Sequence, residues 1–228
     1  MDTTHESSAS STDAAAEPAA KPAKGIPPIV FVLFLGMVFS LTVMAITLRR
    51  GLGRGELPVM GQVTGFEFVD QSGRTVKAES LRGRVWIAGF IFTRCSGPCP
   101  RVTASMATLH NNDKLRQIPL VSFSVDPTHD TPEVLTDYAK NFSVDTRRWR
   151  FLTGDKDKMT VLIRGTFKLP IAEAKDGSVP PGEAITHSDR LMLIDRQGRI
   201  RGAWDSLDPA AMARLEAAAL HLLANPKS

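Results

Sequence analysis

The longest uninterrupted apolar stretch of the chain runs from Ile26 to Leu48 and contains no charged residue. An α-helix over this stretch would be about 35 Å long, which exceeds the roughly 30 Å of a bilayer's hydrocarbon core. Pro27 and Pro28 stand at its start, where a helix tolerates proline. The pattern predicts a transmembrane helix over residues 26–48. A cleaved signal peptide is the alternative, but the run is too long for one and no Ala-x-Ala site follows it.

Residues on either side of this stretch are more polar. Residues 1–25 are rich in Ser, Ala, Thr and Pro with almost no large apolar side chain, so we predict a disordered tail. Residues 49–60 are predicted to form a linker. Residues 61–225 carry regular apolar periods and are predicted to form one globular domain.

Apolar runs and alternating patterns inside this domain predict its elements. Strands are predicted at 66–68, 75–76, 85–93, 119–125, 150–152, 190–194 and 199–204. Helices are predicted at 99–110, 131–141 and 156–167 and from Asp208 onward, and a long loop is predicted at 169–186, where Pro and Gly gather. This order favours an α/β fold with helices on both faces of a mixed sheet.

Composition narrows the function classes. The formal net charge is only +4, and no Lys/Arg stripe with interleaved aromatic residues is present, so we do not expect a nucleic-acid partner. The chain has two cysteines. Such a sparing use of cysteine fits either an oxidising compartment or a dedicated thiol site.

Both cysteines lie in one short segment that follows a predicted buried strand. Cys95 and Cys99 have a Cys-x-x-x-Cys spacing, and residues four apart share a face if the segment is helical. The amides and dipole of a helix N-terminus also favour thiolate over thiol. We therefore predict a redox or soft-metal site. The competing interpretation is that two small buried cysteines merely fill space.

A soft cation needs further ligands, and histidine is the natural candidate. His5 lies in the predicted tail, His110 lies about 16 Å along the helix from Cys99, and His221 lies in the last helix. His129 and His187 remain, because each neighbours a strand end that the topology can bring to the edge carrying the cysteines. Two thiolates and an imidazole suit copper, especially Cu(I), whereas a structural zinc site usually takes a fourth protein ligand.

Asp126 and Asp130 flank His129 in the loop after the strand at 119–125. Either could present charge to a metal or a partner. A structural interpretation is favoured, in which Asp126 begins a turn before Pro127 and Asp130 caps the next helix in a capping-box pattern ending at Glu133.

Three segments together resemble the Sco/SenC family. They are Phe92-Thr-Arg-Cys-Ser-Gly-Pro-Cys-Pro100, Ser124-Val-Asp-Pro-Thr-His-Asp-Thr131, and His187-Ser followed by Leu193-Ile-Asp-Arg-Gln-Gly198. The resemblance extends from about Phe66 to Leu223 and implies a thioredoxin-like fold. It implies a copper chaperone for the copper A centre of cytochrome c oxidase, with copper held by Cys95, Cys99 and His187. Ser96 and Thr186 depart from the family, which usually has Pro and an acidic residue at these positions.

The resemblance also implies an inner-membrane anchor with the domain on the extracytoplasmic, periplasmic side. The positive charges flanking the span, Lys21 and Lys24 before it and Arg49, Arg50 and Arg54 after it, do not decide the orientation. The expected partners are the oxidase subunit carrying the copper A site, the membrane, and a thiol reductant for the cysteines.

An alternative hypothesis comes from another functional class. An extracytoplasmic thiol-disulfide oxidoreductase would use Cys95 and Cys99 as a redox disulfide without any metal. The thioredoxin motif, however, has two intervening residues where this chain has three, and an oxidoreductase has no need of His187.

Overall fold

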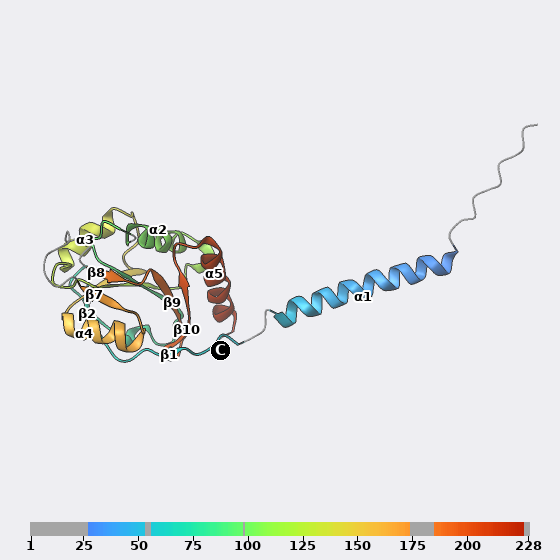
Figure 1. The fold of residues 1–228 in the computed structure, drawn as a ribbon, viewed down its shortest axis with the longest axis horizontal. Coiled ribbons are helices and arrows are strands. Elements are labelled where there is room, and N and C mark those ends of the chain that lie inside the picture. Colours follow the sequence, from blue (N-terminus) through green and yellow to red (C-terminus); the bar gives the residue numbers. More distant parts are fainter. Residues whose placement is uncertain (1–26, 53–55, 98, 174–184, 226–228) are drawn as a thin grey trace, which may run out of the picture. The chain divides into compact units, whose positions relative to one another are not determined.

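The computed structural model describes residues 27–52, 56–97, 99–173 and 185–225. The chain divides into two compact units, Met1–Gly55 and Glu56–Ser228 (Figure 1). The predicted tail over residues 1–25 lies outside the described residues.

The described part of the first unit is a single helix, α1, over Pro28–Leu52. Its segment Pro28–Ile46 has a mean hydropathy of 2.7 and no buried residue, so its length and composition suffice to cross a membrane. The Thr42 hydroxyl donates to the Val38 carbonyl, which satisfies a polar group inside an apolar helix. The helix continues to Leu52, so the first residues of the predicted linker are helical.

The second unit is built on an eight-stranded mixed sheet in the order β1-β10-β9-β4-β5-β6-β2-β3. Strands β4, β5 and β6 are parallel, and the other neighbouring pairs are antiparallel. The strands are β1 Gly61–Gln62, β2 Glu67–Asp70, β3 Thr75–Lys77, β4 Trp86–Ile91, β5 Leu120–Ser124, β6 Trp149–Thr153, β9 Arg190–Ile194 and β10 Arg199–Asp205.

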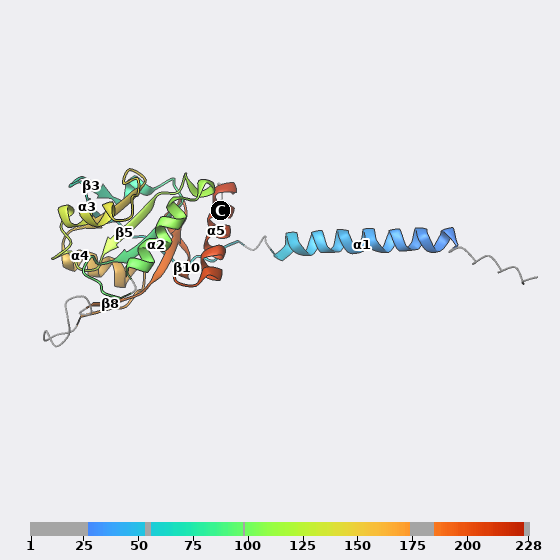
Figure 2. The same ribbon diagram turned by 90° about the horizontal axis from the view of Figure 1, so that it is seen from above.

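Helices cover both faces of this sheet, as the order of elements predicted. They are α2 Cys99–His110, α3 Pro132–Lys140, α4 Lys156–Val161 and α5 Pro209–Ala224, with short turns η1 Ala78–Leu81 and η2 Asp113–Leu115. Figure 1 shows α2 and α3 on one side of the strands and α4 on the opposite side, and Figure 2 views the sheet from the α2 side.

The central strand β4 divides its side chains between two apolar cores. Trp86, Ala88 and Phe90 join the core under α4, and Ile87 and Ile91 join the core under α2, α3 and α5. Successive strand residues point to opposite faces, so a continuous apolar run is what a strand covered on both faces requires. The predicted α/β class with a mixed sheet is confirmed.

Two predictions about the segment 156–186 need correction. The helix predicted over 156–167 is α4 followed by a π-helical turn, η3, over Leu162–Thr166. The loop predicted at 169–186 contains two strands, β7 Ile171–Glu173 and β8 Ile185–His187, which pair antiparallel in a separate sheet. These pairings involve residues far apart along the chain, so local Pro and Gly content did not reveal them. The intervening residues 174–184 lie outside the described part.

A buried arginine fastens the beginning of the second unit to the sheet. The guanidinium of Arg201 is fully buried and donates from Nε and Nη2 to the Leu57 carbonyl at 3.0 and 2.5 Å. Its Nη1 contacts Asp195 Oδ2 at 2.9 Å. The Met60 amide donates to Ile200, and β1 then pairs with β10. The chain is therefore tied to β10 from Leu57 onward.

Candidate metal centre

The two cysteines lie where β4 passes into α2. Cys95 is half-buried in the connecting turn, and its amide donates to the Phe92 carbonyl at 3.3 Å. Cys99 is the first residue of α2 and is completely buried. Because the helix begins only at Cys99, the pair does not share a helix face, contrary to the expectation from its spacing. Both side chains are free thiols, and they are hydrogen-bonded to each other.

The environment of Cys99 favours the protonated thiol. Burial raises the pKa of Cys99 far above its ordinary value, and the hydrogen bond to Cys95 and the charge of Asp130 act in the same direction. A backbone hydrogen bond from Phe92 opposes them only in part. The predicted preference for thiolate at the helix start is therefore not met at Cys99, because burial raises the pKa of this thiol by more than the Phe92 hydrogen bond lowers it. Metal binding at this thiol would have to release its proton.

Asp130 is a buried hydrogen-bond acceptor that joins the ends of β4 and β5. Its carboxylate accepts from the Thr93 amide at 3.2 Å, the Thr93 hydroxyl at 2.5 Å and the Ser124 hydroxyl at 2.6 Å. Burial raises the pKa of Asp130, and these hydrogen bonds offset the rise only partly. Thr93 stands two residues before Cys95, so Asp130 holds the turn that carries the first thiol.

The predicted role of Asp130 as a helix cap is wrong. Thr131 is the N-cap of α3, and its hydroxyl accepts from the Val134 amide at 3.4 Å. The capping signal in the sequence was real, but it belonged to the next residue. Because Thr131 caps the helix, the Asp130 carboxylate is available to accept hydrogen bonds from Thr93, in the turn that carries Cys95.

Asp126 lies beside the same turn and has a cationic partner. Its carboxylate contacts Arg94 Nη2 at 2.6 Å, and its carbonyl accepts from the amides of His129 and Asp130 at 3.0 Å. The hydrogen bonds to the Asp126 carbonyl form the turn that was predicted to begin at this residue. Since β4 and β5 are parallel and Ile91 is in register with Ser124, the loop after β5 lies at the edge that carries the cysteines.

Two further residues near Cys99 were not predicted from the sequence. Thr103 follows Cys99 by one helical turn, and its hydroxyl hydrogen-bonds the Tyr138 hydroxyl of α3 at 2.7 Å. Burial raises the pKa of Tyr138, and the charges of Cys99, Cys95 and Asp130 add to the effect. The four-residue spacing from Cys99 could have indicated Thr103. No local signal singles out Tyr138.

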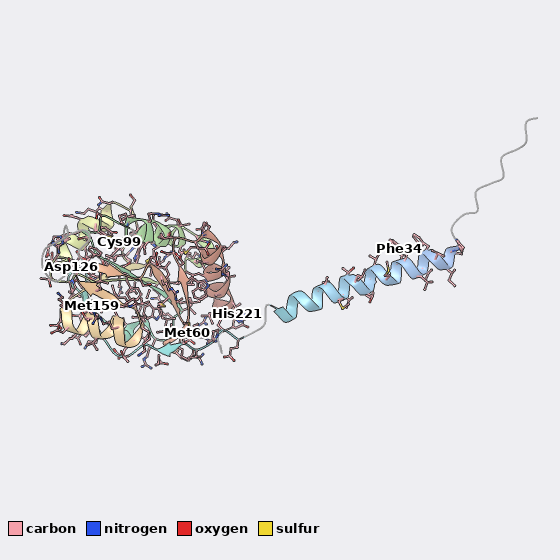
Figure 3. The ribbon with its side chains drawn as sticks, in the orientation of Figure 1. Phe34, Met60, Cys99, Asp126, Met159 and His221 are labelled. Carbon is pink, nitrogen blue, oxygen red and sulfur yellow. The ribbon has the colours of Figure 1, made fainter. Side chains whose placement is uncertain are left out.

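The histidines occupy different parts of the domain. His110 accepts from the Asp145 amide at 3.1 Å, and His221 lies on α5, away from Cys99 and Asp126 (Figure 3). His129 is half-buried in the loop after β5. His187 ends β8, and β9 begins three residues later and runs antiparallel to β4. The backbone therefore brings His187 toward the edge where β4 ends.

Among the side chains that the structure describes, no three His, Cys, Asp or Glu groups form a metal cluster. The centre consists, in those residues, of a thiol pair with Asp126 and Asp130 beside it. Its ligand set beyond the pair stays a prediction.

A thioredoxin-like α/β domain with paired thiols between a central strand and its helix defines a class of thiol-dependent proteins. Comparison of the chain with known protein families narrows that class. The SCO1/SenC family model matches residues 59–220, and the chain belongs to this family.

Individual relatives agree with this assignment. The chain is 35% identical over 147 residues to the SCO1 protein homolog of Bacillus subtilis, covering 63% of this chain and 73% of that one. It is 36% identical over 138 residues to a SCO2-like protein of Rickettsia prowazekii, covering 59% of this chain and 64% of the relative. A putative copper-binding protein of Stutzerimonas stutzeri is 29% identical over 149 residues, covering 64% and 70%.

Solved structures have the same fold. A SCO1/SenC family lipoprotein from Bacillus anthracis matches with a TM-score of 0.65 and 29% identity, covering 72% of this chain and 95% of that one. BsSco, described as a Sco family cytochrome c oxidase assembly protein with a disulfide switch, matches with a TM-score of 0.60 and 30% identity, covering 72% and 98%. Copper-bound ScoI of Bradyrhizobium japonicum matches at 0.55 and 22%, covering 68% and 98%, and shows the fold alone. The predicted thioredoxin-like fold is confirmed.

Proposed function

We propose that this protein is a membrane-anchored copper chaperone that binds copper through Cys95, Cys99 and His187 and delivers it to the copper A centre of cytochrome c oxidase. The observation that carries the proposal is the adjacent Cys95–Cys99 thiol pair at the end of β4 in a chain of the SCO1/SenC family. Relatives described as copper-binding or as oxidase assembly proteins support the cargo and the partner.

The donor set fits copper chemically. Thiolate and imidazole ligands suit Cu(I). Cys95 is half-buried whereas Cys99 is fully buried. We infer that copper enters and leaves on the Cys95 side, and that Cys99 loses its thiol proton as the ion binds.

The residues around the pair would keep it ready for the ion. Asp130 holds the Cys95 turn through Thr93, and the hydroxyl of Thr103, one helical turn after Cys99, is hydrogen-bonded to Tyr138. His129, Asp126 and Asp130 are secondary candidates for contact with the ion or with a partner. Arg94 pairs with Asp126, which leaves this edge of the domain with a balanced pair of charges beside the thiols.

Copper titration tests the ligand set. The full chain in detergent should bind one copper per molecule under reducing, anaerobic conditions, and Cys95→Ser should abolish tight binding by removing a soft ligand. His187→Ala should weaken binding by more than about tenfold, since even outer-shell changes cost 10- to 100-fold. Stoichiometric copper retained by Cys95→Ser would overturn the assignment, and unchanged affinity in His187→Ala would move the third ligand to His129.

Thiol-disulfide exchange by the same pair is the competing function, and the hydrogen bond between the thiols favours it. In that reaction the two thiols would become the Cys95–Cys99 disulfide, with two electrons and two protons passing to a partner disulfide. His187→Ala separates the two functions, because it should leave disulfide formation unchanged while it weakens copper binding. A protein that binds little copper but exchanges disulfides at an unchanged rate in this variant would be an oxidoreductase.

We further propose that α1 spans the membrane once and that the domain lies on the extracytoplasmic side. Its uncharged length supports the span. A reporter that is active only outside the cytoplasm should therefore be active when it is fused after Ser228. Activity of a cytoplasm-specific reporter at the same position would reverse the topology and remove the support for delivery to an extracytoplasmic copper A site.

A further inference from the structure

We propose that Arg164 is a positioning residue, which fixes the strand carrying His187 so that this histidine meets the thiol pair. The inference rests on the proposed ligand set of Cys95, Cys99 and His187. Arg164 itself touches neither cysteine in any described contact. It acts through the backbone of β7, to which its guanidinium donates a hydrogen bond at the Ile171 carbonyl.

The strand β8 depends on β7 for its place in the domain. The two strands form a sheet of their own, and β8 pairs with β7 alone among the described strands. The register places Ile171 opposite His187 and Glu173 opposite Ile185. Ile171 is therefore the residue of β7 that faces the proposed ligand across the pair, and its position sets that of the His187 backbone (Figure 2 shows β8 at the margin of the domain).

Alternating burial holds β7 and the residues before it against the core. Phe167, Leu169 and Ile171 are buried, whereas Lys168 and Pro170 between them are exposed. The Phe167 ring packs on Phe90 of β4 with centroids 5.0 Å apart. Apolar contacts of this kind are non-directional. They keep the segment against the core, but they do not prevent β7 from shifting lengthwise over it.

Arg164 supplies the directional contact at the end of this segment. It lies in the π-helical turn η3, where the Phe167 amide donates to the Leu162 carbonyl and the Leu169 amide donates to Ile163. The chain then reverses, with Lys168 at φ 56°, and brings Ile171 back to the arginine. A guanidinium hydrogen bond to a backbone carbonyl has defined geometry, unlike the apolar packing beside it. This hydrogen bond, which we call the Arg164 clip, is therefore made to Ile171, the residue that pairs with His187.

A ligand already held in place needs less ordering when the ion binds, which strengthens binding without any new contact. Loss of the clip should thus weaken copper binding through His187 and leave the thiol pair as it is. Because Arg164 is exposed as a whole residue, its replacement should not compromise the core.

The test compares copper affinities of the full chain in detergent. Arg164→Met removes the donor and keeps most of the apolar stem, and we expect about tenfold weaker binding, within the range of outer-shell changes. Lys158→Met, on an exposed cation of α4, removes the same charge and should change affinity by no more than about twofold. Arg164→Lys returns one N–H donor and should recover part of the loss.

A double-variant cycle separates positioning from a general structural effect. In the His187→Ala background, Arg164→Met should cause no further loss, because the ligand that it positions is gone. The Cu(II)-loaded Arg164→Met protein should also show weakened nitrogen hyperfine coupling in electron paramagnetic resonance. Equal losses in both backgrounds, or a normal affinity in Arg164→Met while His187→Ala is impaired, would overturn the positioning role and leave the ligand set intact. If His187→Ala itself has no effect, the proposed ligand set fails and the positioning role fails with it.

Discussion

Two buried carboxylates, Asp130 beside the thiols and Asp195 in the β9–β10 hairpin, are surrounded by different donors. The Thr93 amide and the hydroxyls of Thr93 and Ser124 donate to Asp130. Asp195 also accepts from backbone amides, but in addition it contacts the guanidinium groups of Arg199 at 2.6 Å and Arg201 at 2.9 Å.

This difference gives the two carboxyls opposite shifts. Burial raises the pKa of Asp130 and neutral donors do not reverse the rise. Burial also raises the pKa of Asp195, but hydrogen bonds from Arg201 and Arg199 outweigh it, and the pKa is lowered overall. The charge of Asp195 is thus balanced by Arg199 and Arg201, whereas Asp130 has no cationic partner among the described ion pairs and acts on the pKa of Cys99. We interpret the first as a structural clamp and the second as part of the functional edge.

The largest expected effect comes from breaking the clamp. Asp195→Asn would leave Arg201 buried beside a neutral amide, and breaking a buried ion pair from one side typically costs about 3–5 kcal/mol. Urea unfolding should show this loss in the free energy of unfolding at pH 7. A change below about 0.5 kcal/mol, the range of ordinary surface substitutions, would contradict a structural role for the pair.

A smaller effect on stability is expected at the thiol end. Asp130→Asn places an NH₂ group against the hydroxyl donors of Thr93 and Ser124, and lost hydrogen bonds to a charged group cost about 1.5–3 kcal/mol. The same variant should alter the reactivity of the Cys95–Cys99 pair, measured as the rate of thiol alkylation, because Thr93 and the charge near Cys99 both change. Asp195→Asn is the matched control, and it should leave alkylation of the folded protein unchanged.

The pH dependence of these two losses should have opposite signs. The lowered pKa of Asp195 gives stability that is present above its unfolded pKa and disappears as pH falls through the folded value. The difference between wild type and Asp195→Asn should therefore shrink in acid. The raised pKa of Asp130 makes the wild type gain stability as pH falls through the folded value toward the unfolded one. The difference for Asp130→Asn should grow over that interval, and parallel curves for the two variants would refute the comparison.

The smallest expected loss of stability comes from the hydrogen bond between Thr103 and Tyr138. Tyr138→Phe removes the 2.7 Å hydrogen bond and leaves the buried Thr103 hydroxyl without this partner, which should cost about 1–2 kcal/mol. Thr103→Val with Tyr138→Phe removes both polar groups and should recover part of the loss, because neither partner then remains unsatisfied. Thermal unfolding of the single and double variants measures this. Additive losses would show that the two hydroxyls are not coupled.

Sequence patterns predicted most strands of the main sheet, because each of these strands carries its own apolar or alternating pattern. Continuous apolar runs give β4 and β5, and start signals such as Asp208-Pro209 give α5, where Asp208 accepts from the Ala210 amide. The thiol segment was also visible, since both cysteines stand together. The fold class and family followed from these features and from the quoted motifs.

The missed features depend on contacts between residues distant in sequence or on a competition between forces. The pairing of Ile171 with His187 spans residues that carry no strand pattern of their own. Asp130 was expected to cap a helix, but Thr131 was equally suited and took that role. For Cys99, the helix-start effect was recognised, whereas its complete burial, which decides the pKa, was not predictable from spacing.

The Arg201–Leu57 contact also limits the length of free chain that precedes the sheet. α1 ends at Leu52, and the chain is fastened to the sheet from Leu57, so five residue steps separate the two points. Fully extended, they reach at most about 18 Å. If α1 spans the bilayer and the domain delivers copper as proposed, the rate of transfer to a membrane-embedded acceptor should fall when a longer tether is inserted before Leu57, because a longer tether lowers the effective concentration of the domain.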